Sequence, residues 1–326
     1  MGVIDVEGKK YFSDVKYFAD LFNYLLYGGT PVIDPKKLTE LDTDLIVTPY
    51  GNGAKVRVQK YRDLLRLWGA YMDETAAYVM LGAELQGTTN YAMPVKKGLY
   101  DMIGYANQVE EAKKSYQKKD EKNDSQEDNK TGKIKLTSAE FLSGFRKGDK
   151  LIPIITVTVL LSGDDWDGPE DLYGMLDVKD KRLLKFVPNC PINLIAPYRI
   201  PDSDFDKFKT DVGLVLKALK YEKVGADKIL EELTYEQIDR KTVEFLNAVA
   251  NLKLGLNEKE DQVDMFKSIQ DHNTKMMVIA VIKYGRKRGD SDDVIIDAGN
   301  DAGVNGMGMT FDEWYAKYES GSQDYQ

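Results

Sequence analysis

The sequence predicts a mixed α/β fold with a helical C-terminal half, and three observations support this. Residues 151–161 form a continuous apolar run rich in Ile, Val and Thr, as in a central strand buried on both faces. Residues 61–68 and 76–85 are strand-like and flank a segment with a polar centre, as in a β-hairpin. Apolar residues recur at helical spacing over residues 18–26, 95–109 and 205–219.

The elements before the hairpin have recognisable start and stop signals. The first helix should begin after Ser13, a suitable N-cap, and end at the Gly28-Gly29 pair. Residues 45–47 predict a short strand that ends in the turn-rich sequence Thr-Pro-Tyr-Gly-Asn-Gly. After the hairpin, Pro94 suits the first turn of a helix that we expect to run to about residue 116.

The middle of the chain alternates between polar and apolar segments. Residues 117–133 contain no apolar side chain, so burial cannot offset their ordering entropy and we expect a disordered insert. The sequence Thr-Ser-Ala-Glu at 137–140 predicts a capping box. After the apolar run at 151–161, we expect a surface loop at Trp166-Asp-Gly-Pro, a helix over 170–176 and a strand over 192–196.

These elements predict three regions. An α/β core spans residues 10–200, a helical C-terminal region spans 201–288, and a Gly- and Asp-rich tail spans 289–326. Beyond the apolar stripe at 205–219, further helical segments are expected at 229–233, 243–252, 276–282 and 311–318.

Composition places the chain among ordinary soluble proteins, with 30% charged and 42% apolar residues. The net charge of −9 argues against wholesale coating of nucleic acid but leaves room for a local basic site. A single cysteine, Cys190, excludes an internal disulfide framework and most zinc sites. No apolar run approaches the ~18 residues of a membrane span, and the N-terminus lacks the order of a signal peptide. We therefore expect a cytoplasmic protein with no membrane partner.

A candidate site follows from the hairpin register. Directly opposed positions of an antiparallel pair have a constant sum, so a two-residue turn at Asp73-Glu74 places Asp63 opposite Glu84, roughly 5 Å apart. Gln86 projects to the same face. Opposed carboxylates repel each other, and a shared proton, a basic neighbour or a bound cation must offset that repulsion. The ordinary alternative is that both acids mark the solvated ends of strands.

Positive charge gathers around this pair of carboxylates. Residues 55–66 carry five basic side chains against one acid, Asp63, and Lys96 and Lys97 open the helix that follows Glu84. Mg²⁺ commonly takes one or two carboxylates together with water and substrate phosphate. Such an ion can activate water and stabilise charge on a phosphodiester. A basic patch around acids, in a chain that is acidic overall, indicates a site that handles phosphate.

Several segments carry a resemblance to a known family. They are YFSDVKYFADLFNYLLYGG, RDLL, GAELQ, YAMPVKKGLYD, LSGFRKGDKLIPIITVTVLL and DDWDGP, within about residues 10–255. Their order, with Asp on the first hairpin strand and Glu-x-Gln on the second, resembles the recombination-promoting nuclease, or putative transposase, family of the PD-(D/E)XK nuclease superfamily. This resemblance implies an αβββαβ core with a mixed sheet, and Mg²⁺- or Mn²⁺-dependent cleavage of DNA linked to recombination or mobile elements.

The resemblance also implies roles for particular residues. Asp63 and Glu84 would be the catalytic metal ligands, and Gln86 would take the third motif position, which is Lys in most of the superfamily. An amide carries no charge, so the work of that lysine would fall to another side chain, for which the candidates are Lys60, Lys96 and Lys97. An acid from the first helix sometimes joins such sites. Asp20 is the candidate here, and its alternative is a solvated polar face.

The predicted function is therefore a magnesium-dependent DNA endonuclease. A homodimer is a candidate assembly, because nucleases that make paired cuts often dimerise. The alternative is a catalytically decayed nuclease fold that binds DNA or protein, which the missing lysine and the acidic net charge favour. A nucleotide-using enzyme has little support, because the glycine-rich residues 303–308 lack the preceding strand and the Lys-Ser/Thr of a phosphate loop.

Overall fold

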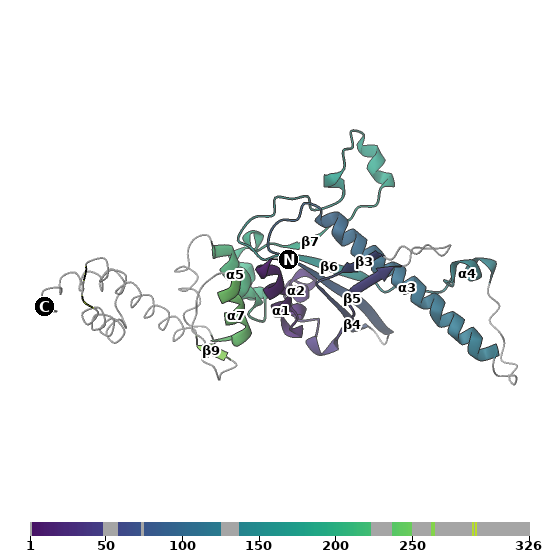
Figure 1. Cartoon of the computed structure of the whole chain (residues 1–326), viewed down its shortest axis with the longest axis horizontal. Helices are drawn as coiled ribbons and strands as arrows, with labels where there is room; N and C mark the ends of the chain where they lie inside the picture. Colours follow the sequence, from purple (N-terminus) through teal and green to yellow (C-terminus); the bar gives the residue numbers. More distant parts are fainter. Residues whose placement is uncertain are drawn as a thin grey trace. The chain divides into compact units, whose positions relative to one another are not determined.

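The computed structural model describes residues 2–47, 58–72, 75–124, 137–222, 237–249 and 262–264, together with 289 and 291. The chain divides into two compact units, Met1–Lys220 and Tyr221–Gln326. The first unit combines a mixed five-stranded sheet with helices, which confirms the predicted α/β class (Figure 1). The helical segments predicted at 229–233, 276–282 and 311–318 lie outside the described residues.

The sheet has the strand order β1-β4-β5-β6-β7. Its strands are β1 (Leu38–Glu40), β4 (Leu64–Met72), β5 (Thr75–Gln86), β6 (Ile154–Leu160) and β7 (Asn193–Ile195). Pairing is antiparallel from β1 to β5 and parallel from β5 to β7. The apolar run at 151–161 forms β6, an interior strand that is buried from its third residue onward, and the strand predicted at 192–196 forms β7.

The hairpin of β4 and β5 has the predicted register. Pairing runs from Met72↔Thr75 to Leu64↔Ala83, and one further step sets Asp63 across from Glu84. The two turn residues, 73 and 74, lie outside the described part of the chain.

The segment upstream of the hairpin differs from the prediction in one respect. β4 begins at Leu64, because the chain bends at Arg62 and Asp63. The residues before the bend form β3 (Val58–Tyr61), which pairs with β2 (Asp44–Val47) in a separate two-stranded sheet. β2 confirms the strand predicted at 45–47. The bend places Asp63 at a strand end, where its side chain can reach across to β5.

Two helices precede the sheet in the chain. α1 (Val3–Phe12) was not predicted, and α2 (Val15–Tyr27) matches the first predicted helix. The N-cap of α2 is Asp14 rather than Ser13, because the Asp14 carboxylate accepts a hydrogen bond from Lys16 N–H. Gly28 ends α2 at φ 59°, a left-handed conformation that favours glycine. The short turn η1 (Pro35–Lys37) then leads into β1.

The two faces of the sheet are covered by different helices. A Cβ at Gly8 of α1 would collide with Leu161 and lie 3.6 Å from Leu85, so α1 covers the face to which Leu85 points. α3 (Met93–Asp124) lies on the opposite face, where its Asp101 accepts a hydrogen bond from Thr156 of β6. Alternation along β5 directs Glu84 and Gln86 to this second face, toward α3.

α3 corrects the predicted insert. The disordered segment was expected over residues 117–133, but α3 continues through Asp124; residues 125–136 lie outside the described part. Residues 117–124 are rich in Lys, Gln and Glu, which have good helix propensity, and extending an existing helix avoids the cost of nucleation. The predicted capping box is confirmed at the start of α4 (Ser138–Ser143), where Thr137 and Glu140 bond reciprocally.

The helix predicted over 170–176 is wrong. This segment contains only the single 3-10 turn η2 (Tyr173–Met175), followed by η3 (Lys181–Phe186). Gly174 weakens helix formation. Asp171 instead bonds Gly174 N–H at 2.8 Å and Asn189 Nδ2 at 3.0 Å, which closes a loop rather than starting a helix.

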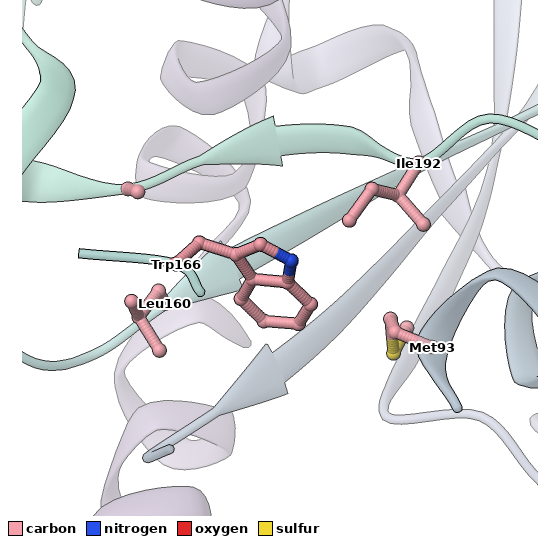
Figure 2. Packing of buried hydrophobic residues seen from close by; sticks show 5 residues of the cluster. Met93, Leu160, Trp166 and Ile192 are labelled. Atoms are coloured by element: carbon pink, nitrogen blue, oxygen red, sulfur yellow. The ribbon is translucent and has the colours of Figure 1, made fainter. Parts of the chain in front are cut away.

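The loop at Trp166 is not a simple surface turn, because Trp166 is only 2% exposed. Its ring packs with Met93, Leu160, Ile192 and Ala196 (Figure 2). Arg199, in the 3-10 turn η4 (Pro197–Arg199), fixes the backbone around it by donating to Asp165 Oδ1 at 2.5 Å and to the Trp166 carbonyl at 2.7 Å. Trp166 therefore joins the loop after β6 to the start of α3 and to the residues that flank β7.

The first unit ends with η5 (Asp202–Lys207) and α5 (Val212–Tyr221). The stripe predicted at 205–219 is buried, although its first residues belong to η5 and the turn after it rather than to α5. The described part of the second unit comprises β8 (Gln237–Asp239), α7 (Arg240–Val249) and β9 (Gln262–Asp264), and α7 matches the helix predicted over 243–252. Within the described residues, no helix has the length and apolarity required to cross a membrane.

Candidate cation site at Glu84

Glu84 lies near the end of β5 with its side chain fully buried beneath α3. Lys96, in the first turns of α3, places its Nζ 2.9 Å from Glu84 Oε2. Arg62 places its Nε 3.9 Å from Glu84 Oε1. Each carboxylate oxygen thus faces one cationic side chain. The Lys96 contact is at hydrogen-bonding distance, but within the described part of the chain neither oxygen receives a hydrogen bond of good angular geometry.

The electrostatics of Glu84 reflect this burial. Desolvation raises its pKa from 4.5 to about 7, and the negative charge of Asp63 adds to that rise, while Lys96 and Arg62 oppose it. For Lys96 itself, burial is the largest single influence and lowers the pKa, but the charge and hydrogen bonding of Glu84, together with Tyr100 and Asp63, outweigh it and raise the pKa. The arrangement therefore favours a charged lysine beside a carboxyl group that exchanges its proton near neutral pH.

Asp63 lies across from Glu84, as the register predicts, but its carboxylate is held differently. Asp63 Oδ2 accepts a hydrogen bond from Leu85 N–H at 2.9 Å, which ties the bend before β4 to β5. The influence of Asp63 on the pKa of Glu84 and of Lys96 places the three charges in one electrostatic neighbourhood. The hydrogen bond leaves Oδ1 for another partner.

Gln86 occupies the next position along the same face of β5. Its Nε2 donates to the Leu85 carbonyl at 2.8 Å, and its Oε1 accepts from Asn90 Nδ2 at 3.3 Å. Both ends of the amide are therefore engaged locally, and the side chain is fixed at the strand end.

The three candidate lysines have different surroundings. Lys96 meets Glu84, whereas Lys97 pairs with Asp101, with Nζ 3.0 Å from Oδ2. Lys60 belongs to β3, opposite Leu45, and its side chain lies outside the described part of the structure.

Asp20 is neither solvated nor joined to Glu84. Its side chain is 3% exposed, and its carboxylate accepts hydrogen bonds from the backbone N–H groups of Lys209 and Thr210 and from the Thr210 hydroxyl. Burial raises the pKa of Asp20, and these hydrogen bonds oppose the rise. Asp20 thus fastens α2 to the turn before α5.

Sequence reasoning missed a buried network that supports the site. Arg62 donates to Thr156 Oγ1 at 2.8 Å and to Asp101 Oδ1 at 2.9 Å, and its side chain is 1% exposed. A Cβ at Gly82 would collide with the Arg62 guanidinium, so the glycine makes room for it. Asp101 also pairs with Lys97, and the i, i+4 spacing of these two residues is the one sequence signal of this network. The position of Arg62 follows from the bend before β4, which the sequence pattern did not predict.

Thr158 was also missed. It is the register partner of Glu84 on the parallel strand β6, so the two side chains share one face. Its hydroxyl is buried without a hydrogen-bond partner among the described residues. Buried polar groups are normally satisfied by protein or by ordered water. Unsatisfied oxygen atoms on neighbouring strands are therefore consistent with a site that takes a further polar ligand.

The carboxylate oxygens at this site suit a hard cation that takes only one or two ligands from the protein. The described residues contain no group of three or more His, Cys, Asp or Glu side chains suited to a metal. Mg²⁺ does not require such a group, since one or two carboxylates with water and substrate oxygen suffice. Glu84 and Asp63 supply two carboxylates of the right chemistry, and the oxygens of Glu84 are not saturated by hydrogen bonds.

Comparison with protein-family models, with curated proteins and with solved structures found no match.

Proposed function

We propose that the chain is a divalent-cation-dependent DNA endonuclease with a core of the PD-(D/E)XK type. The observation that carries this proposal is the position of Asp63 across the hairpin from a buried Glu84 that faces Lys96. Two acids from adjacent strands of the hairpin, with one base from α3 beside them, are the groups needed to hold a cation against a phosphate. The mixed sheet flanked by α1 and α3 is compatible with such a core.

Each residue has a role that its contacts support. When bound, Mg²⁺ or Mn²⁺ supplies Lewis acidity that activates water and stabilises charge on a phosphodiester. Glu84 and Asp63 hold the cation from neighbouring strands. Lys96, at the start of α3, would provide the positive charge that Gln86 lacks and would bind a phosphate oxygen. Gln86, fixed by Asn90 and the Leu85 carbonyl, shapes the strand end beside it.

Plasmid nicking tests the proposal. Supercoiled DNA is incubated with Mg²⁺ or Mn²⁺ and with the wild type, Asp63→Asn or Glu84→Gln, each checked for folding by circular dichroism. Asp180→Asn is the matched control, because Asp180 is an acid on an exposed turn that bonds Arg182. Both site variants should lose nicking while the control retains it. Equal nicking by all four proteins would exclude this site as the source of cleavage.

One observation favours the alternative, a decayed nuclease fold that binds DNA. The charges around Glu84 are already paired within the protein, and Glu84 is fully buried. DNA binding by the wild type without cleavage in Mg²⁺, Mn²⁺ or Ca²⁺ would support this alternative over the endonuclease.

A further inference from the structure

The contacts of Glu84 place two protein cations where a metal ion would bind. Lys96 Nζ is 2.9 Å from Oε2, and Arg62 Nε is 3.9 Å from Oε1. A divalent cation bound to Glu84 would come within a few ångströms of both groups. At such separations the repulsion between like charges amounts to several kcal/mol even at an effective dielectric constant of about 20. One of the two groups must therefore withdraw.

The surrounding charges balance without a metal ion. Among the side chains that the structure describes, the charged cluster beneath α3 comprises three acids, Asp63, Glu84 and Asp101, and three bases, Arg62, Lys96 and Lys97. Adding a divalent cation leaves this half-buried cluster with two excess positive charges. Withdrawal of one base, or arrival of an anion, is needed to offset that excess.

The three bases differ in their freedom to withdraw. Arg62 is 1% exposed and is anchored by hydrogen bonds to Thr156 and Asp101. Lys97 is 14% exposed and pairs with Asp101 rather than Glu84. Lys96 is 29% exposed, and its ion pair is with Glu84. It has a flexible stem with a route to solvent, so the base closest to the Glu84 carboxylate is also the one best able to move.

An aromatic ring already flanks the Lys96 ammonium in its position beside Glu84. The centroid of the Tyr100 ring, one turn further along α3, is 5.7 Å from Lys96 Nζ. An aromatic face attracts an ammonium group at this range. Rotation of the lysine side chain away from Glu84 can therefore retain part of its stabilisation while it exposes the charge to an incoming anion.

We propose that Lys96 occupies the cation position at Glu84 in the metal-free protein and competes with a divalent cation for that carboxylate. Loading of the cation releases the Lys96 ammonium toward solvent, where it meets an anionic ligand such as a phosphodiester. This inference rests on the cation site of the proposed function but does not require that the protein cleave DNA.

Calorimetric titration with Mn²⁺, without DNA and at the same pH of about 8.5 for every variant, tests the competition. Lys96→Met keeps the length of the side chain and removes its charge, so it should bind Mn²⁺ at least about tenfold more tightly than the wild type. Lys96→Arg retains the charge and should bind no more tightly than the wild type. Lys97→Met is the matched control for a general loss of positive charge, and its gain should be much smaller.

A double variant locates the effect. Adding Glu84→Gln to Lys96→Met should remove the gain in affinity, because the competition concerns that carboxylate. Unchanged or weaker Mn²⁺ binding by Lys96→Met, equal gains in the Lys96→Met and Lys97→Met proteins, or a gain that survives Glu84→Gln would each overturn the proposal. Nicking assays report separately on the endonuclease: tighter Mn²⁺ binding by a protein that never nicks DNA would uphold the competition and refute only the nuclease activity.

Discussion

Arg62 and Asp101 form a buried ion pair, with Nη2 2.9 Å from Oδ1, that joins the bend before β4 to the first third of α3. Asp101 also accepts from Thr156 and pairs with Lys97, so one carboxylate serves three partners. This network holds α3 over the sheet at the distance that allows Lys96 to reach Glu84. Its integrity is therefore a precondition for the geometry of the site.

Removing the charge of Asp101 should destabilise the fold strongly. Asp101→Asn leaves the Arg62 guanidinium buried without its counter-charge, and breaking such a pair from one side costs about 3 kcal/mol or more. Urea unfolding followed by circular dichroism measures the loss. Asp167→Asn is a suitable control, because Asp167 accepts from Tyr91 at the surface and should cost less than about 1 kcal/mol. Equal stability of both variants would show that the network is not structural.

Asp20 should act on stability and not on cation binding. Its carboxylate receives backbone N–H groups of Lys209 and Thr210, so Asp20→Ala leaves buried donors without acceptors at a cost of about 1–3 kcal/mol. Unfolding in urea should detect this loss, while Mn²⁺ affinity at a temperature where the variant is folded should equal that of the wild type. Weaker Mn²⁺ binding by the folded variant would restore Asp20 as an accessory ligand.

The pKa of Glu84 predicts a particular pH dependence of stability. Its folded value of about 7 exceeds the ordinary value of 4.5, so the folded state binds the proton more tightly than the unfolded state. Where the folded state holds more protons, stability falls as pH rises. The contribution of Glu84 is therefore fully present below about pH 4.5 and is lost as pH increases to about 7.

Comparison with Glu84→Gln isolates this effect from the other titrating groups. The difference in unfolding free energy between the wild type and Glu84→Gln, measured in urea from pH 5 to pH 8, should shift against the wild type as pH rises. Divalent cations are chelated throughout, because a bound cation would stabilise the charged form. A constant difference across this range would mean that Glu84 titrates near its ordinary value in the folded protein.

The hairpin shows how far the sequence alone reaches. A polar-centred segment between two apolar runs was sufficient to predict the register that sets Asp63 across from Glu84, because strand periodicity leaves few alternatives. The bend at Arg62 was not predictable, since it depends on a guanidinium that fits against Gly82 and finds Asp101 on a helix 39 residues away in the sequence. Long-range polar contacts of this kind leave no periodic signal.

The contacts of the candidate lysines were also not predictable from the sequence. Lys96 and Lys97 are adjacent in sequence, yet one pairs with Glu84 and the other with Asp101. Successive residues of a helix point about 100° apart, so only the rotation of α3 over the sheet decides which lysine meets which acid. That rotation is fixed by Met93, which packs against Trp166 at the start of α3, and by the bonds of Asp101 further along, a combination that becomes visible only in the packed structure.

The position of Gln86 allows a rescue experiment on the endonuclease. If Lys96 supplies the charge that most PD-(D/E)XK nucleases place at the third motif position, Lys96→Met should lower plasmid nicking by about a hundredfold, even though it binds the cation more tightly. Gln86→Lys returns a positive charge to the face of β5 that carries Glu84. In the Lys96→Met background, this second change should raise the nicking rate at least about tenfold above that of Lys96→Met alone.

The matched control for the rescue is Gln86→Met in the same background, which replaces the amide without adding charge. It should leave nicking at the level of Lys96→Met. Initial rates at saturating Mg²⁺ separate this effect on chemistry from the change in cation affinity. Recovery by both second changes would indicate that loss of the Gln86 contacts, rather than the added charge, restores the rate, and recovery by neither would mean that charge at this strand end does not replace that of Lys96.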